Sequence, residues 1–207
     1  MEIAFDESSP QKEILRAALK EFVEYGQKGA RMQSIADRAN VNKALLHYYF
    51  SNKQNLHREV LHRVFRMAIN SIYQSIDEAD SPENQIRGII RAYFSLFRQN
   101  PAIPRLMLLE LNANSSDFIE AFTQVFQADT VPFPQKMIQI IEDGIERGIF
   151  RPVNPRQALL STLGTVAFYF IARPFARQVL SIENEDQFIE ERLEHIQDLI
   201  FHGLIKE

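Results

Sequence analysis

Apolar residues recur every three or four positions along most of the chain, and Pro, Gly, Ser and Asn separate the periodic segments. A first helix is predicted to begin after the cap residue Ser9, with Pro10 in its first turn, and to continue to Gly26. Alternating apolar and polar runs, which are typical of strands, are not apparent. The pattern therefore predicts an all-α protein.

Residues that start and stop helices divide the rest of the chain in the same way. One long helix is predicted from about Asn52, with apolar residues on its inner side as far as Ile76. The later helices are predicted over about 82–99, 101–111, 116–126, 132–147, 154–173 and 186–205. No flexible linker is apparent, so we place the domain boundary inside the long helix and predict domains over 1–59 and 60–207.

Two short helices joined by a tight turn are predicted between Gln33 and Lys53. The apolar positions that would hold them together are Ile35, Ala36, Ala39, Val41 and Leu46. Asn40 suits the turn, because Asn tolerates the positive φ at which helices often end, and Asn42 suits the N-cap of the second helix. This arrangement is that of a helix-turn-helix.

The second helix of this motif carries residue types that contact DNA. The side chains that point away from its apolar side are Lys43, Ala44, His47, Tyr48 and Tyr49. Ala44 is small enough to let base edges of the major groove come close. Spacing does not decide which of Tyr48 and Tyr49 contacts the DNA and which packs, and His47 can instead be a half-buried packing residue.

The start of the long helix offers a place for a phosphate group. Ser51 or Asn52 can cap this helix, and the amides of its first turn together with the Lys53 ammonium suit an anion. Gln33, in the first short helix, is a further candidate for DNA contact. The alternative for Lys43 and Lys53 is that both are ordinary solvated lysines.

The ordered set of residues resembles the helix-turn-helix of TetR-like (TetR/AcrR) transcriptional regulators, whose pattern includes LYxHFxxKxxL. The similarity extends from about Gln11 to Val60, and the matching positions are Ile35, Ala36, Val41, Leu46, Phe50, Lys53 and Leu56. His47 stands where the family usually has Tyr, Tyr49 where it usually has His, and Asn40 where Gly is common. The resemblance implies a three-helix DNA-binding head, joined by a long fourth helix to a helical ligand-binding and dimerisation body.

Basic residues are concentrated around this motif, although the whole chain has a formal net charge of −4. Between Tyr25 and Arg66, eight basic residues stand against two acidic ones, a net charge of +6. A cationic end suits the phosphate backbone of DNA, whereas the rest of the chain is strongly anionic. A chance asymmetry is the alternative.

A chain of 207 residues, of which 45% are hydrophobic, is long enough to bury a sizeable core. It contains no Cys, which excludes disulfides and thiolate metal sites. We expect a cytoplasmic protein without a membrane span, because neither a signal peptide nor an apolar run of about 18 residues is apparent. The most apolar stretch, Leu159–Ala172, is interrupted by Ser, Thr and Gly and is predicted to be a buried helix.

The last two long helices have wide apolar faces that need partners. The residues are Leu159, Leu163, Val166 and Phe170 on the first, and Phe188, Leu193, Ile196, Ile200 and Leu204 on the second. The resemblance implies that these helices pair with their copies in a homodimer, which would present two recognition helices to the half-sites of an inverted repeat in double-stranded DNA. The alternative is that both helices close the core of the monomer.

Aromatic residues are frequent in the predicted second domain, and the resemblance implies that they surround one ligand cavity. An apolar or amphipathic small molecule would suit such a cavity. The candidate wall residues are Phe94, Phe97, Met107, Phe122 and Tyr169, and the candidates for orienting a polar group are Glu110, Asn112 and Arg173. Each of them can instead belong to the plain core or to the surface.

Catalysis finds little support, since the sequence has no Cys, no phosphate-binding glycine loop and no HExxH pair. His57 and His62 lie too far around one helix to converge on a metal, and His195 and His202 share a face without an evident carboxylate partner. We therefore predict no cofactor and a sequence-specific DNA-binding regulator, a dimeric repressor that a small molecule releases by moving the long helix. The alternatives are an all-helical binding or carrier protein without specific DNA recognition and, more remotely, a helical enzyme.

Overall fold

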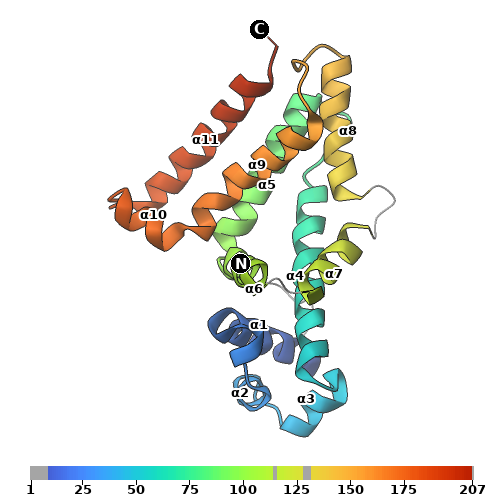
Figure 1. Cartoon of the computed structure of the whole chain (residues 1–207), viewed down its shortest axis with the longest axis vertical. Helices are drawn as coiled ribbons and strands as arrows, with labels where there is room; N and C mark the ends of the chain where they lie inside the picture. The colour runs from blue at the N-terminus through green and yellow to red at the C-terminus, as the bar shows by residue number, and fades with distance from the viewer. Residues whose placement is uncertain (1–8, 114–115, 128–131, 207) are drawn as a thin grey trace. The chain divides into compact units, whose positions relative to one another are not determined.

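The computed structural model describes residues 9–113, 116–127 and 132–206 of the chain. Within them the backbone forms consecutive helices, labelled α1 to α11 in Figure 1. They are α1 (Pro10–Gly29), α2 (Met32–Arg38), α3 (Lys43–Phe50), α4 (Lys53–Tyr73), α5 (Pro82–Gln99), α6 (Ala102–Ala113), α7 (Ser116–Phe126), α8 (Phe133–Glu146), α9 (Pro155–Ile171), α10 (Arg173–Val179) and α11 (Glu185–Leu204). In these ranges, extended backbone pairs at one isolated antiparallel β-bridge, between Phe150 and Ile205. The predicted all-α class is confirmed.

The chain is divided into two compact units. The first contains residues 1–67 and 99–125, and the second contains residues 68–98 and 126–207. Helices α1 to α3, most of α4, α6 and nearly all of α7 belong to the first unit, while α5 and α8 to α11 belong to the second. The predicted DNA-binding domain over 1–59 lies within the first unit, which also includes α6 and α7.

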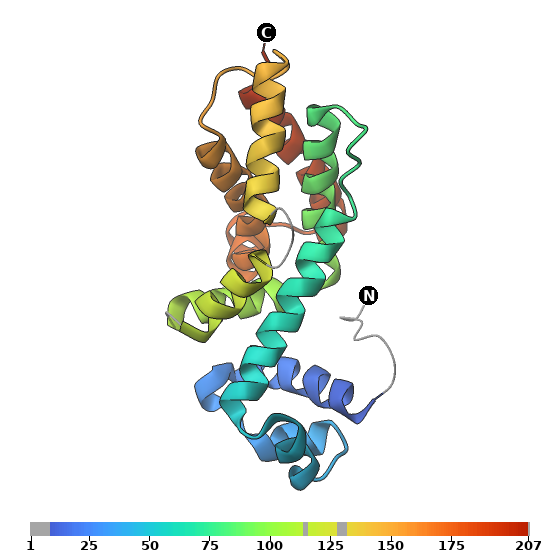
Figure 2. The same cartoon turned by 90° about the vertical axis from the view of Figure 1, so that its right-hand side faces the viewer.

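Helix α1 lies at the centre of the first unit and packs against α2, α3 and α6; Figure 2 shows α1 to α3 beside the first turns of α4. Its predicted apolar residues are all buried, namely Ile14, Leu15, Ala18, Leu19 and Phe22. Pro10 begins the helix, as predicted, and Gly26 kinks it with a φ of 67°. Glycine adopts this left-handed conformation at little cost, since it has no Cβ. Leu56, Val60 and Val64 of α4 are buried as well.

The turn between α2 and α3 has the geometry that the sequence predicted. Asn40 has a φ of 52°, and the amide of the following Val41 donates to the carbonyl of Ala36 at 3.0 Å. This hydrogen bond closes a Schellman motif, in which a left-handed residue ends the helix. Asn42 then caps α3, because its side-chain oxygen accepts from the Leu45 amide at 2.7 Å. The predictions for Asn40 and Asn42 are confirmed.

Aromatic and branched side chains fill the second unit. Phe94 and Phe97 of α5 pack edge to face on Phe170 of α9, with ring centroids 5.0 and 5.6 Å apart. Helix α9 also packs against α8, α10 and α11. Phe150, beyond the end of α8, lies directly over Gly144, where a Cβ atom would come within 2.1 Å of the ring. A larger residue at position 144 would therefore displace this buried ring.

Most observed helix boundaries agree with the predicted ones to within two residues. The long helix was predicted as far as Ile76, but α4 ends at Tyr73. Ser9 precedes α1 without a side-chain capping bond. The prediction missed α10, which follows α9 at a bend of 75°. Arg173–Pro174 was predicted only to end a helix, yet proline in a first turn also begins one.

No single helix in the described ranges is long and apolar enough to cross a membrane. Helices α9 and α10 meet that criterion only together, as a bent pair.

Candidate nucleic-acid interface

Helix α3 has one buried side and one exposed side. Leu46 and Phe50, four residues apart, are buried against the rest of the first unit, as are Ile35 and Ala36 of α2. The predicted DNA contacts on α3 are all exposed, namely Lys43, Ala44, His47, Tyr48 and Tyr49. The helix-turn-helix therefore holds a short helix whose outer surface combines a cation, an imidazole, two phenols and one small residue.

The two tyrosines of α3 differ in exposure. Tyr48 is 81% exposed, whereas Tyr49 is 37% exposed. The ring of Tyr49 lies 6.2 Å from the ring of the buried Phe50, and the Tyr48 ring packs nearly perpendicular to that of Tyr49 at 5.4 Å. Tyr48 thus projects further into solvent, and Tyr49 packs closer to the buried side of the helix. The spacing of the two residues in the sequence did not predict this difference.

The imidazole of His47 is held by the end of its own helix. Its Nδ1 lies 2.8 Å from the carbonyl oxygen of Ser51, and because a carbonyl only accepts, Nδ1 must donate. In the neutral ring, Nε2 is then a hydrogen-bond acceptor. Ser51 has a φ of 59° and a ψ of −55°, and the Asn52 amide donates to the Phe50 carbonyl at 2.6 Å, which is a γ-turn of the rare positive-φ type. This tight turn connects the end of α3 directly to the start of α4.

Gln33 lies on α2, and its side-chain amide donates to Asp37 at 2.8 Å. Its nitrogen keeps a second hydrogen and its oxygen keeps its lone pairs, so the exposed Gln33 retains groups for a nucleic acid. Asp37 places a negative charge beside it, which favours contact with a base edge over contact with a phosphate.

Lys53 has internal partners that the sequence did not reveal. Its Nζ lies 3.0 Å from the carbonyl oxygens of both Lys28 and Ala30, at the end of α1. Carbonyl groups there lack helical partners, and a cation near them also suits the helix dipole. One ammonium hydrogen is left for a phosphate. Of the two predicted caps for α4, Asn52 is the one observed, since its side chain accepts from the Asn55 amide at 2.9 Å.

Part of the positive charge predicted for this region is neutralised within the first unit. Arg38 lies 3.3 Å from Glu21 and 3.1 Å from Glu24, and Arg63 lies 2.6 Å from Glu59. In the described part of the chain, no ion pair involves Lys28, Arg31 or Lys43. These three cations lie at the α1–α2 corner and at the start of α3.

A buried carboxylate from α7 binds the side of α4 and the end of α1. Asp117 accepts from Arg58 at 2.7 Å and from Gln54 and Gln27 at 3.2 Å each. Burial by itself raises the pKa of this carboxyl, but the hydrogen bonds from Arg58 and Gln54 outweigh burial and hold the pKa below its usual range. Asp117 therefore remains ionised while it joins three helices.

A second polar contact links α4 to α6 through buried side chains. His57 is completely buried, and its Nε2 lies 2.9 Å from Oε1 of Glu110, which is 3% exposed. Phe22 of α1 packs edge-on against the imidazole, with ring centroids 4.8 Å apart. The remaining polar atoms of the pair, His57 Nδ1 and Glu110 Oε2, have no hydrogen-bond partner among the described residues. This pair was not predicted from the sequence, because its members are 53 positions apart.

The predicted ligand-binding residues are divided between the two units. Phe94, Phe97, Tyr169 and Arg173 belong to the second unit, and Met107, Glu110, Asn112 and Phe122 to the first. Arg173 donates to both oxygens of Glu185, at 2.5 and 3.0 Å, and the Tyr169 hydroxyl donates to the same carboxylate at 2.9 Å. Burial and this hydrogen bond raise the pKa of Tyr169 to about 12, so its hydroxyl stays protonated. Arg173 thus joins the start of α10 to the start of α11.

The faces of α9 and α11 that were assigned to a dimer are largely used inside the second unit. The buried members are Leu159, Val166, Phe170, Ile196 and Leu204. For these residues the assigned face was wrong, because they pack inside the unit. On α9, apolar side chains lie on all sides, so its periodicity does not single out one face. The large apolar side chains that are exposed on the same helices are Leu160 (67%), Phe168 (64%) and Leu199 (55%).

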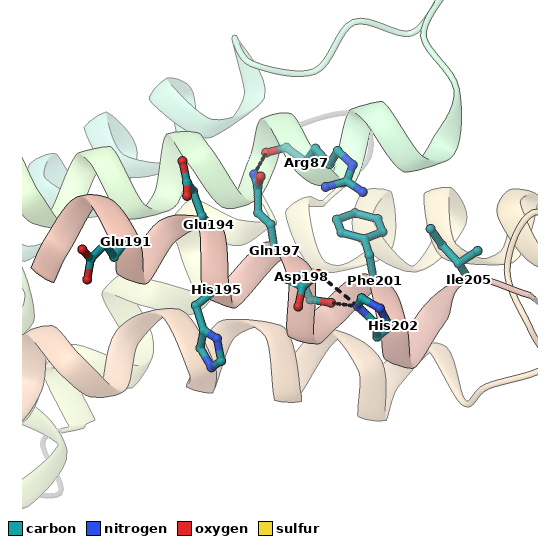
Figure 3. Close-up of a pocket in the computed structure, with 9 residues that line it drawn as sticks. All are labelled: Arg87, Glu191, Glu194, His195, Gln197, Asp198, Phe201, His202 and Ile205. Atoms are coloured by element: carbon teal, nitrogen blue, oxygen red, sulfur yellow. Dashed lines mark hydrogen bonds and ion pairs between the residues drawn. The ribbon is translucent and has the colours of Figure 1, made fainter.

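A groove of about 750 Å³ runs along α11 beside α5 in the second unit (Figure 3). The Arg87 guanidinium lies over the Phe201 ring at 3.9 Å, and His202 Nδ1 lies 3.1 Å from the Asp198 carboxylate. His195 and His202, which were predicted to share a face of α11, both line this groove (Figure 3). Over the described ranges, no three His, Cys, Asp or Glu side chains come together to hold a metal ion.

Both parts of the chain match models of known protein families. Residues 14–60 match the model described as bacterial regulatory proteins, tetR family. Residues 82–200 match the model described as tetracyclin repressor-like, C-terminal domain. Together the two matches include the helix-turn-helix and more than half of the chain.

Comparison with individual proteins also identifies transcriptional regulators. The HTH-type transcriptional regulator RutR of Escherichia coli K12 is 25% identical over 198 residues, which cover 95% of this chain and 91% of that protein. The HTH-type transcriptional regulator YhgD of Bacillus subtilis is 30% identical over 148 residues, with 70% and 74% coverage. The crystal structure of FadR from Bacillus subtilis in complex with stearoyl-CoA has the same fold, with a TM-score of 0.74 at 18% identity, covering 93% of this chain and 98% of that one.

Proposed function

Because the chain belongs to the TetR family of bacterial regulatory proteins and is a DNA-binding transcriptional regulator, we propose that α3 reads an operator in the major groove. The observation that carries this proposal is the division of α3 into a buried side and an exposed side. Leu46 and Phe50 anchor the helix, and every α3 residue predicted to contact DNA is on the exposed side. The two-sided helix fits a recognition helix held by its partner helix.

The proposed contacts have different roles. Ala44 lets base edges approach the backbone, and Nε2 of a neutral His47 accepts a hydrogen bond from an exocyclic amine of adenine or cytosine. Lys43 and the remaining hydrogen of Lys53 meet phosphate groups, which fixes the register but carries no sequence information. The set is completed by Gln33, Tyr48 and Tyr49.

The protein is proposed to act as a homodimer through α9 and α11. The exposed apolar side chains on these helices support this, because Leu160, Phe168 and Leu199 would be removed from water in a symmetric interface. A dimer presents two copies of α3 to an inverted repeat, whose half-site centres are expected about 34 to 36 Å apart, or a multiple of that distance. We also propose a cytoplasmic location, because the proposed operator DNA of a bacterial regulator is found there.

The region over residues 60–207 is proposed to bind a small apolar or amphipathic effector that releases the repressor from its operator. The similar FadR structure holds stearoyl-CoA. The residues proposed as candidate effector contacts are Phe94, Phe97, Tyr169 and Arg173 in the second unit, and Met107, Glu110 and Phe122 in the first. By linkage, effector and operator must weaken each other's binding equally, typically by about 1 to 3 kcal/mol. A small molecule whose affinity is the same with and without operator DNA is not such an effector.

Selection of the purified protein against randomised duplexes, near physiological salt, tests the proposed function. An enriched inverted repeat whose affinity falls steeply with salt is expected. Ala44→Glu is a suitable control, because it places a carboxylate against the bases on an exposed position that should change the free energy of unfolding by less than about 0.5 kcal/mol. Absence of enrichment for the native protein, with weak binding that vanishes at moderate salt, would contradict the proposal.

A further inference from the structure

Helices α6 and α7 are joined to α4 by two polar contacts of different character. Asp117 accepts three hydrogen bonds, so its carboxylate is well satisfied. The His57–Glu110 pair is deeper, and one polar atom of each side chain has no partner in the described part of the chain. Gln54, His57 and Arg58 are spaced so that they share one face of α4. Both carboxylates therefore reach the same side of the helix that follows α3.

Stability does not account for the His57–Glu110 pair. Burying an imidazole and a carboxyl costs several kcal/mol of solvation, and one hydrogen bond with two unsatisfied atoms returns only part of that. A protein in which apolar side chains of similar volume replace a buried polar pair is commonly as stable as the original, or more stable. The pair instead restricts how α4 and α6 pack. Its hydrogen bond of 2.9 Å requires a defined distance and angle between the two side chains, whereas apolar contact is non-directional.

We propose that His57 and Glu110 are positioning residues for DNA binding, whose hydrogen bond sets α4 against α6 and thereby sets the presentation of α3. The connection is short, since α4 begins three residues after α3 ends and His57 lies in the second turn of α4. The tight turn at Ser51 links the two helices, and its carbonyl holds the His47 ring. A change in the tilt of α4 is therefore passed directly to the surface proposed to contact bases. This inference rests on the proposed function of α3.

The test is the double variant His57→Phe/Glu110→Met, which removes the directional bond and keeps an apolar contact of similar volume. Replacing one partner alone is avoided, because an unpaired buried polar group can prevent folding. The melting temperature of the double variant should equal or exceed that of the native protein. Its affinity for the duplex enriched by selection should fall about tenfold, as expected for the loss of one coupled contact.

Glu110→Gln is the conservative variant. Its amide can donate to Nε2 of His57 once the ring proton is on Nδ1, so it keeps a directional bond and should bind DNA within about threefold of the native affinity. Equal affinities of the native protein and the double variant would overturn the proposal. A Glu110→Gln variant as weak as the double variant would also overturn it, because a hydrogen bond would then not be what positions the helix.

Hydrogen exchange separates a failure of this inference from a failure of the proposed function. In the double variant, amides of α3 and α6 should exchange about tenfold faster than in the native protein, although the melting temperature is not lowered, while those of α8 in the second unit should not change. If the native protein enriches no duplex, the proposed function fails and the exchange measurement decides the inference. Unchanged exchange in α3 and α6 would then overturn it.

Discussion

Replacing Lys53 by Met should weaken both the folding of the first unit and the electrostatic part of DNA binding. The Lys53 ammonium donates to the carbonyls of Lys28 and Ala30 at 3.0 Å each, and Met keeps the length of the aliphatic stem without a donor. A hydrogen bond to a charged group contributes about 1.5 to 3 kcal/mol. Lys53 is partly exposed, so water replaces some of this, and we expect the two bonds together to stabilise folding by about 2 kcal/mol.

Urea denaturation measures the free energy of unfolding, and DNA affinity at several salt concentrations gives the slope of log K against log salt. For Lys53→Met we expect a loss of about 2 kcal/mol and a slope smaller in magnitude by about 1.8, the value for one phosphate contact in each subunit of the dimer. Lys43→Met is the matched control, because Lys43 is exposed and has no ion pair among the described residues. It should change the slope equally and the free energy of unfolding by less than about 0.5 kcal/mol.

The free energy of unfolding tests the structural role of Lys53, and the salt slope tests its contact with phosphate. An unchanged free energy of unfolding in Lys53→Met would show that its bonds to the end of α1 do not stabilise the fold. A lower free energy with an unchanged slope would keep that structural role but remove Lys53 from the phosphate contacts.

Three further variants test other parts of the structure. The pKa of Asp117 is lowered in the folded protein, so its ionised form stabilises folding above the usual Asp pKa of about 3.9. Asp117→Asn should therefore be less stable than native at pH 7, and urea denaturation should show the difference shrinking as pH falls through the lowered pKa; a difference independent of pH would contradict this. Gly144→Ala should lower the free energy of unfolding by about 1 to 3 kcal/mol, because its Cβ would meet the buried Phe150 ring, whereas an unchanged melting temperature in calorimetry would mean that the ring moves freely. Phe168→Glu should give monomers in sedimentation, while Ile119→Glu, at a similarly exposed position on α7, should not; dimers in both would place the interface elsewhere.

Features that act over a few residues could be predicted from the sequence. Asn40 ends α2 and Asn42 caps α3 through bonds to backbone groups close to them in the chain, so residue type and position were sufficient. The His57–Glu110 pair joins positions 53 apart, and no local pattern marks either residue as the partner of the other. Glu110 could therefore be proposed as a ligand contact, but its buried partner could not be foreseen.

Helix α9 shows a second limit of prediction from periodicity. Its strongly apolar sequence correctly predicted a helix, but only part of that helix is buried, including the completely buried Val166. Leu160 and Phe168 are apolar as well, yet they are mostly exposed in the single chain. A helix that is apolar on every side carries no signal for which side faces its own unit and which faces a partner. The three-dimensional packing was needed to assign the exposed face.

The charge of the DNA-binding end illustrates the same limit and gives a measurable expectation. The count of eight basic residues between Tyr25 and Arg66 includes several that the structure places in ion pairs, and a cation already paired with a carboxylate releases no counterion from DNA. Five of the eight have no ion pair among the described residues, namely Lys28, Arg31, Lys43, Lys53 and Arg66. Arg66 lies in the fourth turn of α4, far along the helix from α3, so the first four are the cations counted for phosphates. About four contacts per subunit predict a salt slope of about −7 for a dimer, whereas eight would predict about −14. A measured slope near the larger value would mean that the ion pairs of α2 and α4 open when the protein binds DNA, and that binding reorganises the first unit.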